Sequence, residues 1–149
     1  MRIYTTFWPK SKILKWLGIR TKKYFFMELD DQATWAMDYT LAMIIVPMLK
    51  QLRETKHGAP FVDDEDVSDE LKSTNALPGK DGDVDSNHFK RWDWILDEMI
   101  WAFEQDAMDD GWKEQYYTEK VDREGIDKHY KRMQNGHRLF GKYYNSLWD

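Results

Sequence analysis

Hydrophobic residues recur every three or four positions along three long stretches of this chain. That spacing places apolar side chains on one side of an α-helix, whereas the strict alternation typical of a half-buried strand is scarce. We therefore predict an all-α fold with three principal helices, at about 32–56, 88–108 and 122–147. A short amphipathic helix over 10–18 precedes them, and a long acidic loop joins the first two principal helices.

The first principal helix carries two adjacent apolar stripes. One stripe consists of Met37, Leu41, Ile44 and Met48, and the other consists of Trp35, Ala42, Ile45, Leu49 and Leu52. An apolar surface this wide predicts a helix that is buried for most of its circumference. Pro47 lacks a backbone donor and clashes with the preceding turn, so we expect a kink or a break near Val46.

The second principal helix combines aromatic surface with negative charge in the stretch WDWILDEMIWAFEQ at 92–105. One face forms a predicted core stripe of Phe89, Trp92, Leu96, Met99 and Phe103. Trp94 and Trp101 lie seven residues apart on the opposite face, where acidic residues flank them. Another helix of the chain, a second copy or a ligand must cover that face, and protein packing is favoured over a ligand. A homodimer or a larger symmetric oligomer is the simplest cover.

The third principal helix also has two distinct faces. Its predicted core stripe consists of Ile126, Tyr130, Met133, His137, Phe140, Tyr144 and Leu147. A basic stripe lies opposite and consists of Lys128, Lys131, Asn135, Arg138 and Lys142. A solvated face, or pairing with the acidic loop, is the more ordinary explanation of this stripe. The alternative is an anion-binding site, since Arg138 and Lys142 lie one turn apart with an amide nearby.

Composition narrows the classes of protein that fit. The chain has 149 residues and no cysteine, so it has the length of one domain and cannot use a thiolate, a disulfide or a cysteine-bound zinc. A net charge of −5 argues against binding of long nucleic acid, which favours a basic surface. The longest apolar run, at 41–49, is too short to cross a membrane. We interpret 1–23 as a basic, aromatic lead-in, 24–29 as a β-compatible run or the approach to the first helix, and 57–87 as a partly disordered acidic loop.

A ligand site can be assembled from the two faces that the core does not use. Trp rings stack on nucleobases, Arg and Lys pair with phosphates, and amide or carboxylate groups bond ribose hydroxyls. We therefore predict a site for a small anionic, nucleotide-like ligand between the second and third principal helices, formed by Arg91, Trp94, Glu98, Trp101, Asn135, Arg138 and Lys142. The sequence predicts no cofactor, metal ligand or catalytic residue, because it has no phosphate-binding loop, nucleophile motif or complete calcium loop.

Carboxylates spaced three residues apart leave an enzymatic alternative open. Helical nucleotide pyrophosphohydrolases bind magnesium through such pairs on facing helices. The pairs with that spacing here are Asp106 with Asp109 and Glu119 with Asp122. They lie around a turn marked by Gly111 rather than on facing helices. A magnesium-dependent hydrolase is therefore less favoured than a protein that binds without catalysis.

Three blocks of the sequence resemble one family. The blocks are TWAMDYTLAMIIVPMLKQLRETKHGAPFVDDEDV at 34–67, RWDWILDEMIWAFE at 91–104 and RMQNGHRLFGKYYNSLWD at 132–149. They are similar to a family of small tailed-bacteriophage proteins that has no assigned active site. The resemblance implies a phage protein in the cytoplasm of an infected bacterial host, and it assigns no role to any residue. Residues 1–23 and 73–87 lie outside it.

Small phage proteins without catalytic motifs often oppose host defence. The resemblance and the predicted ligand site together lead us to expect an anti-defence protein that sequesters a nucleotide-derived immune signal without chemistry. A virion or assembly protein, whose spare faces bind other protein chains, is the first alternative. The magnesium-dependent nucleotide pyrophosphohydrolase is the second.

Overall fold

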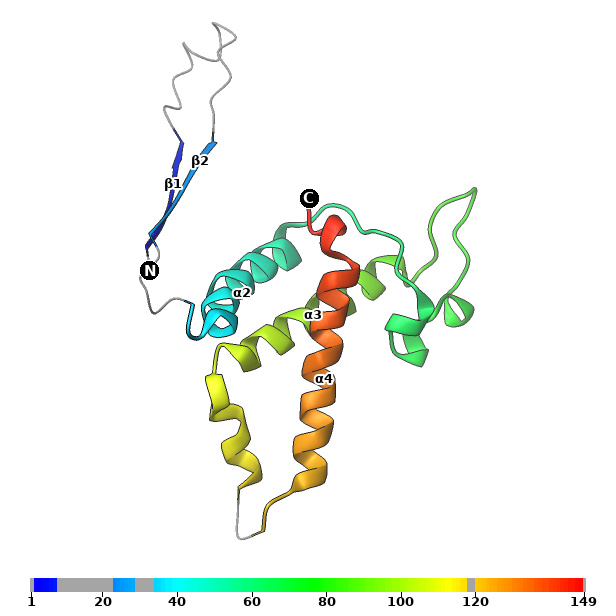
Figure 1. The fold of residues 1–149 in the computed structure, drawn as a ribbon. Coiled ribbons are helices and arrows are strands. Elements are labelled where there is room, and N and C mark those ends of the chain that lie inside the picture. Colours follow the sequence, from blue (N-terminus) through cyan, green and yellow to red (C-terminus); the bar gives the residue numbers. More distant parts are fainter. Residues whose placement is uncertain (1, 8–22, 29–33, 118–119, 149) are drawn as a thin grey trace, which may run out of the picture. The chain divides into compact units, whose positions relative to one another are not determined.

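The computed structural model describes residues 2–7, 23–28, 34–117 and 120–148. The chain divides into two compact units, Met1–Met37 and Asp38–Asp149. The predicted all-α class is confirmed, since helices dominate the described residues (Figure 1). The short helix predicted over 10–18 lies outside the described residues.

The first unit contains a pair of antiparallel strands. Strand β1, Arg2–Phe7, pairs with β2, Lys23–Glu28. The register places Arg2 opposite Glu28 and Phe7 opposite Lys23. Strand β1 is rich in aromatic and β-branched residues and β2 in aromatic residues, which fit a pleated surface. The sequence identified only the second strand as β-compatible, because a six-residue run carries no information about its pairing partner.

Helix α2, Met37–Thr55, begins later than predicted and runs through Pro47. The predicted break near Val46 is therefore wrong, and a kink there stays a prediction. Pro47 is exposed, so water can bond the carbonyl group of the preceding turn that lacks its usual N–H donor. The helix buries only Ala42 and Leu49, which both belong to the second apolar stripe.

The acidic loop that follows α2 consists largely of tight turns. It contains three 3-10 helices, η1 Asp64–Asp66, η2 Asp69–Leu71 and η3 Ser73–Asn75. A turn at Asp81 and Gly82 reverses the chain, with φ angles of 54° and 86°. The two sides of this turn are joined by Leu77 and Ser86, whose backbone and side-chain groups exchange two hydrogen bonds of 3.0 Å. Partial disorder of 57–87 stays a prediction.

Helices α3, His88–Asp106, and α4, Arg123–Lys142, cross at the centre of the second unit (Figure 1). Its largest fully buried side chains are Trp92, Ile95, Leu96 and Met99 from α3 and Leu139 from α4. Burial of a large apolar side chain contributes roughly 1.5–3 kcal/mol. The predicted core stripe of α3 is confirmed except at Phe89, which is exposed.

The buried face of α4 differs from the predicted stripe. Met133, Gly136 and Leu139 are buried, whereas Tyr130 and Tyr144 are exposed. At about 100° per residue, the buried face is turned by roughly 70° from the predicted stripe.

A close approach of the two helices explains this rotation. A Cβ atom added at Gly136 would lie 2.3 Å from the Cβ of Ala102 and 2.7 Å from the carbonyl oxygen of Glu98. Real Cβ atoms do not approach other atoms so closely, so only glycine fits at this crossing. The sequence places an otherwise poor helix former in the middle of α4, and the crossing is the reason.

Shorter elements complete the second unit. The 3-10 helix η4, Asp109–Tyr116, follows α3, and η5, Tyr144–Ser146, follows α4. Asp122 is the N-cap of α4, and its side chain accepts a hydrogen bond of 2.9 Å from the Gly125 N–H. None of the described helices is both long enough and apolar enough to span a membrane.

Candidate functional site

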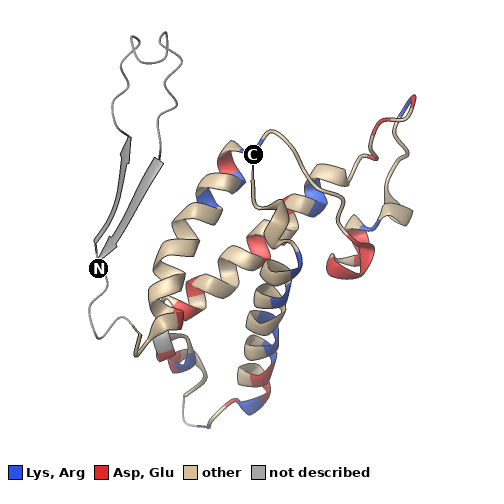
Figure 2. Ribbon diagram, turned by 45° about the horizontal axis from the view of Figure 1, so that its top comes forward, with Lys and Arg blue, Asp and Glu red and all other residues tan. Residues whose placement is uncertain are grey.

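The basic stripe of α4 contacts the acidic helix η1 through one shared carboxylate. Arg138 Nη2 donates to Asp66 Oδ1 at 2.6 Å, and Lys142 Nζ lies 2.6 Å from Oδ2. The Tyr143 hydroxyl donates to the same Oδ2 at 2.7 Å. The Asp66 side chain is only 1% exposed, so these donors replace the water that a buried charge loses. Figure 2 shows the Lys and Arg residues that repeat along α4.

The surroundings of Asp66 hold it ionised. Burial is the largest single influence and raises the pKa of the Asp66 carboxyl, but the bonds from Lys142, Tyr143 and Arg138 together lower it below its ordinary value of 3.8. Burial, and then the bond to Asp66, raises the pKa of Tyr143 to about 12. Bonds to Asp63 and Asp66 raise the pKa of Lys142. At neutral pH, Asp66 is therefore a carboxylate, Lys142 an ammonium ion and Tyr143 a neutral phenol.

Three carboxylates of η1 and its N-cap lie close enough together to hold a cation. Oxygens of Asp63, Glu65 and Asp66 lie within 4.8 Å of one another, the one such group among the described residues. Lys142 Nζ lies 2.7, 3.1 and 2.6 Å from oxygens of these residues, in that order. The ammonium group of the chain itself therefore neutralises the cluster.

Three of the seven predicted ligand-binding residues meet at this point. Asn135 Oδ1 accepts from Arg138 Nε at 3.0 Å and from Nη2 at 2.9 Å, which fixes the orientation of the guanidinium. Arg138 and Lys142 then bind Asp66 on its two oxygens. The stripe therefore pairs with the acidic loop, which was its more ordinary explanation, and the anion that these residues hold in this structure is Asp66.

Glu98 and Trp101 contact α4 through Arg132, a residue that the sequence analysis did not place in the site. Arg132 Nη2 and Nε donate to the two oxygens of the buried Glu98 at 2.6 and 3.0 Å. The bond to Glu98 raises the pKa of Arg132. The guanidinium carbon lies 3.9 Å from the centre of the Trp101 ring, which is a cation–π contact. Another helix of the chain therefore covers Trp101.

His129 extends this stack on α4. Its ring centre lies 4.8 Å from that of Trp101 and 4.3 Å from that of Trp112, with which it is stacked at 8°. Nδ1 bonds the Tyr116 hydroxyl at 3.1 Å, and Nε2 is buried without a hydrogen-bond partner among the described residues. Burial, followed by the charge of Arg132, lowers the pKa of His129 below its ordinary 6.5. A neutral imidazole thus packs here as an aromatic ring.

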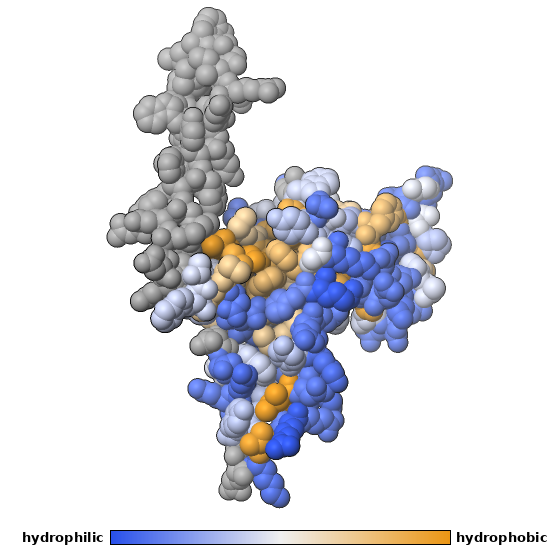
Figure 3. All heavy atoms as spheres, viewed as in Figure 1, coloured by the Kyte–Doolittle hydropathy of each residue, from blue (hydrophilic) through white to orange (hydrophobic). Residues whose placement is uncertain are grey.

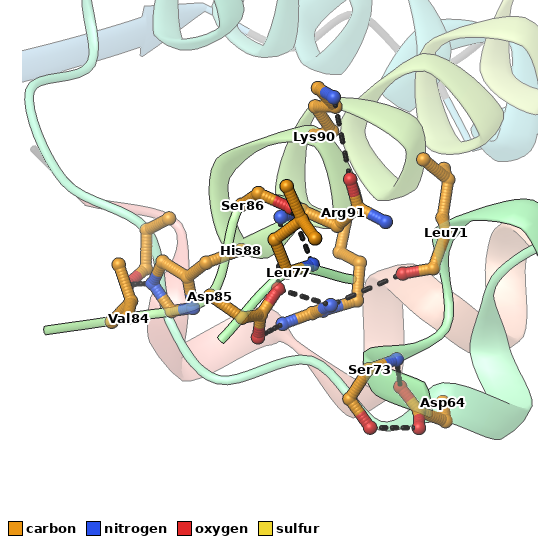
Figure 4. Close-up of polar contacts among 12 residues, drawn as sticks. Asp64, Leu71, Ser73, Leu77, Val84, Asp85, Ser86, His88, Lys90 and Arg91 are labelled. Atoms are coloured by element: carbon orange, nitrogen blue, oxygen red, sulfur yellow. Dashed lines mark hydrogen bonds and ion pairs between the residues drawn. The ribbon is translucent and has the colours of Figure 1, made fainter. Parts of the chain in front are cut away.

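Arg91 closes the acidic loop onto α3. Its Nη2 and Nη1 bond the two oxygens of Asp85 at 2.5 and 3.1 Å, and Nη1 also donates to the Leu71 carbonyl at 3.1 Å (Figure 4). The bond from Arg91 lowers the pKa of Asp85. The same view shows Ser73 bonded to Asp64 through both its hydroxyl and its N–H. The buried Arg91 therefore holds the acidic loop against α3, and its hydrogen bonds are to Asp85 and Leu71 rather than to Asp66.

Three further acidic residues of α3 pair with α2. Arg53 Nε lies 3.0 Å from Asp97 Oδ1, and Arg53 Nη1 lies 3.2 Å from Asp93 Oδ1. Lys50 Nζ lies 2.6 Å from Glu104 Oε1. Partly exposed pairs of this kind contribute roughly 0–1 kcal/mol each, so they orient α2 more than they stabilise it.

Trp94 is the last of the seven residues predicted to bind a ligand, and it is 36% exposed.

An apolar groove of about 880 Å³ runs between α2 and the C-terminal segment. Residues of α2 from Leu41 to Thr55 line one wall, and Phe140, Tyr144, Leu147 and Trp148 line the other. None of the lining residues carries a formal charge. Figure 3 shows hydrophobic residues gathered over α2, with hydrophilic residues along α4. This apolar groove is thus assembled from a helix and a segment far apart in sequence.

Two of the four carboxylates proposed for a hydrolase are used in other ways. Asp106 Oδ2 lies 2.6 Å from His137 Nε2 and also lines a smaller pocket of about 280 Å³. Asp122 caps α4. Glu119 lies outside the described residues. In the described part of the chain, Asp106 and Asp122 do not belong to a group of metal-ligand spacing.

Two features of the site escaped the sequence analysis. Asp66 is one of six acidic residues within eight positions, and nothing in the sequence distinguishes it from its neighbours. The groove could not be predicted because both of its walls were assigned to the core.

Comparison with protein-family models, curated proteins and solved structures finds no match to this chain.

Proposed function

We propose that this protein is a noncatalytic interaction protein, and that its groove binds an amphipathic helix of protein. The observation that carries the proposal is the exposure of the first apolar stripe of α2. Met37, Leu41 and Met48 are 57%, 43% and 64% exposed, although the sequence pattern is that of a largely buried helix. Contiguous apolar surface of this kind usually marks a site of association.

The dimensions of the groove favour a helix as its occupant. The α2 wall extends from Leu41 to Thr55, which is about 21 Å at 1.5 Å per residue. A helix of about four turns matches that length and presents apolar anchors every three or four residues. A groove without charged lining offers no cation to pair with a phosphate or a carboxylate, and most of its lining is apolar, so an apolar partner surface fits it best.

The resemblance to small tailed-phage proteins supplies the context of this proposal. An interaction protein of that origin would act in the assembly of phage particles within the infected bacterium. This role corresponds to the assembly alternative from the sequence, and it needs neither a cofactor nor a catalytic residue.

Sequestration of a nucleotide-derived signal is the second candidate, and one observation favours it. Arg138, Lys142 and Tyr143 converge on a single anion, which is the kind of geometry that also binds phosphate. A ligand would have to displace Asp66 from a position where it is almost fully buried. Calorimetry with cyclic dinucleotides and ADP-ribose-derived signals tests this candidate, and heat release that Arg138→Ala abolishes would establish it.

Site-specific photocrosslinking tests the interaction function. A benzophenone amino acid at Tyr144, which lines the groove and is 63% exposed, should form a discrete adduct with a protein chain in bacterial cells. The same amino acid at Tyr117, which is 59% exposed outside the groove, is the control. A second change, Leu52→Asp, should remove the Tyr144 adduct by placing a charge in the groove wall. Equal labelling from Tyr144 and Tyr117 would refute the proposal.

A further inference from the structure

The exposed stripe of α2 has a spacing that reads the same in both directions. Met37, Leu41, Ile44 and Met48 are separated by four, three and four residues. This is the spacing of a coiled-coil seam, in which apolar residues alternate between three and four positions. The residue types are also symmetric, because two methionines flank a leucine and an isoleucine.

From this symmetry we infer that α2 of a second copy packs along this stripe, over the Leu41–Met48 part of the groove, so that two chains form an antiparallel dimer about a twofold axis. The inference rests on the proposed function and names its partner. A twofold axis between Leu41 and Ile44 places Leu41 opposite Ile44 of the second copy. Met37 then lies opposite Met48 of the second copy, and every apolar position of the stripe meets another.

The charges of α2 are compatible with this contact. Lys50 and Arg53, the basic residues nearest to the stripe, are turned toward α3, where they pair with Glu104, Asp93 and Asp97. Among the described residues, none that lines the groove is charged, and Asp38 of the first turn of α2 lines the smaller pocket instead. The groove contact would therefore bury no unpaired charge. The net charge of −5 per chain gives a general repulsion that salt screens, and raising the salt concentration should therefore strengthen the dimer.

The available area suits a dimer of moderate affinity. The apolar residues of this surface with the largest exposure are Met37, Leu41, Met48, Tyr144 and Trp148, at 57%, 43%, 64%, 63% and 74%. With roughly 200 Å² for a large side chain, these fractions correspond to about 600 Å² per copy. A standard interface buries about 800 Å² per partner. The dimer should therefore dissociate at concentrations on the order of micromolar.

Two methionines of α2 provide a matched pair of variants. Met48 is 64% exposed on the stripe, and Met43 is 51% exposed on another side of the same helix. In sedimentation equilibrium of the full chain, Met48→Glu should raise the dimer dissociation constant by about 100-fold, since the symmetry doubles a roughly tenfold effect per copy. Met43→Glu adds the same charge and should leave the constant within about twofold.

Spin labels then test the direction of the two helices, because a single introduced cysteine is unique in a chain that has none. At 1.5 Å per residue, labels at Met43→Cys in the two copies should be offset along the axis by about 2 Å, and labels at Glu54→Cys by about 35 Å. A parallel dimer would give offsets near zero at both positions.

A monomer at all concentrations up to about 100 micromolar, far above the expected dissociation constant, would overturn the inference. Equal weakening by Met48→Glu and Met43→Glu, or short distances at both labels, would overturn it as well. These failures are separable from failure of the proposed function. If the Tyr144 crosslink captures a different protein while the chain stays monomeric, the groove binds protein and the second copy is not its partner. If it captures nothing above the control, the proposed function fails too.

Discussion

The crossing of α3 and α4 leads to a sharp prediction about two glycines of the same helix. Gly136 and Gly141 both lie within α4. A Cβ atom at Gly136 would lie 2.3 Å from the Cβ of Ala102 and 2.7 Å from the carbonyl oxygen of Glu98, whereas a Cβ atom at Gly141 would meet nothing within 4 Å. Alanine at the two positions therefore makes the same chemical change in opposite packing environments.

Two effects determine how much each alanine changes the free energy of unfolding. Replacing glycine by alanine inside a helix stabilises it by about 1 kcal/mol at either position. At Gly136, the obstructing atoms are a backbone carbonyl and a Cβ atom, which cannot swing away as the end of a long side chain can. The helices must move apart, and overpacking of this kind costs about 1–3 kcal/mol. A gap of only 2.3 Å places the cost near the upper end, at about 3 kcal/mol.

We therefore expect Gly136→Ala to lower the free energy of unfolding by about 2 kcal/mol and Gly141→Ala to raise it by about 1 kcal/mol. Urea denaturation measures both values, and the difference of about 3 kcal/mol isolates the cost of the crossing. In a melting experiment on a chain of this length, the two variants should differ by roughly 6–12 °C. If Gly136→Ala were as stable as Gly141→Ala, the close crossing and the rotation of α4 that it explains would both be wrong.

Three further predictions concern the polar contacts of α4. Asp66→Asn should lower the free energy of unfolding by about 3 kcal/mol in urea, because it removes a buried charge from its donors. The pKa of Asp66 in the folded protein lies below 3.8. The ionised side chain therefore contributes to the free energy of unfolding above pH 3.8, and this contribution is lost as the pH falls through the folded pKa. Asp66→Asn should not show that loss of stability in acid. The folded pKa of His129 lies below 6.5, so the unfolded state takes up the proton first and the melting temperature should fall below pH 6.5. The same pH dependence in His129→Gln would contradict that assignment. Arg138→Ala should lower the melting temperature without any ligand, and an unchanged value would favour a vacant ligand site over the structural bond to Asp66.

The positions of the helices could be predicted because their spacing signals are local. The 3.6-residue periodicity placed α3 and α4 close to where the structure has them. The start of α2 was predicted too early because its apolar pattern extends upstream into residues that form a turn. Pro47 was misjudged because an exposed proline costs a helix less when water can satisfy the freed carbonyl.

The orientation of α4 could not be predicted, since it depends on a contact between two helices. The stripe through Tyr130 and Tyr144 is the apolar face of α4 in the sequence, but Gly136 allows the closer approach. Tight packing at the crossing rotates the stripe toward the surface, where it supplies one wall of the groove.

The candidate site was predictable to the extent that its residues share a helix. Asn135, Arg138 and Lys142 meet because one turn of α4 brings them together. Their anion lies 72 residues from Arg138 in sequence, within a run of chemically similar acids. No spacing rule connects such distant positions, so the sequence could predict an anion there without identifying Asp66.

The combination of aromatic surface and negative charge on α3 is explained by its position between two helices. Its acids hold the basic residues of α2 on one side, and Glu98 holds Arg132 of α4 on the other. The ring of Trp101 packs under Arg132 and is therefore already covered within the single chain. Among the described residues, the apolar stripe of α2, the helix whose sequence predicted burial most strongly, remains exposed. Since apolar exposure on that helix is not explained by any contact of the described chain, a function based on association accounts for more of the sequence than a function based on the tryptophans of α3.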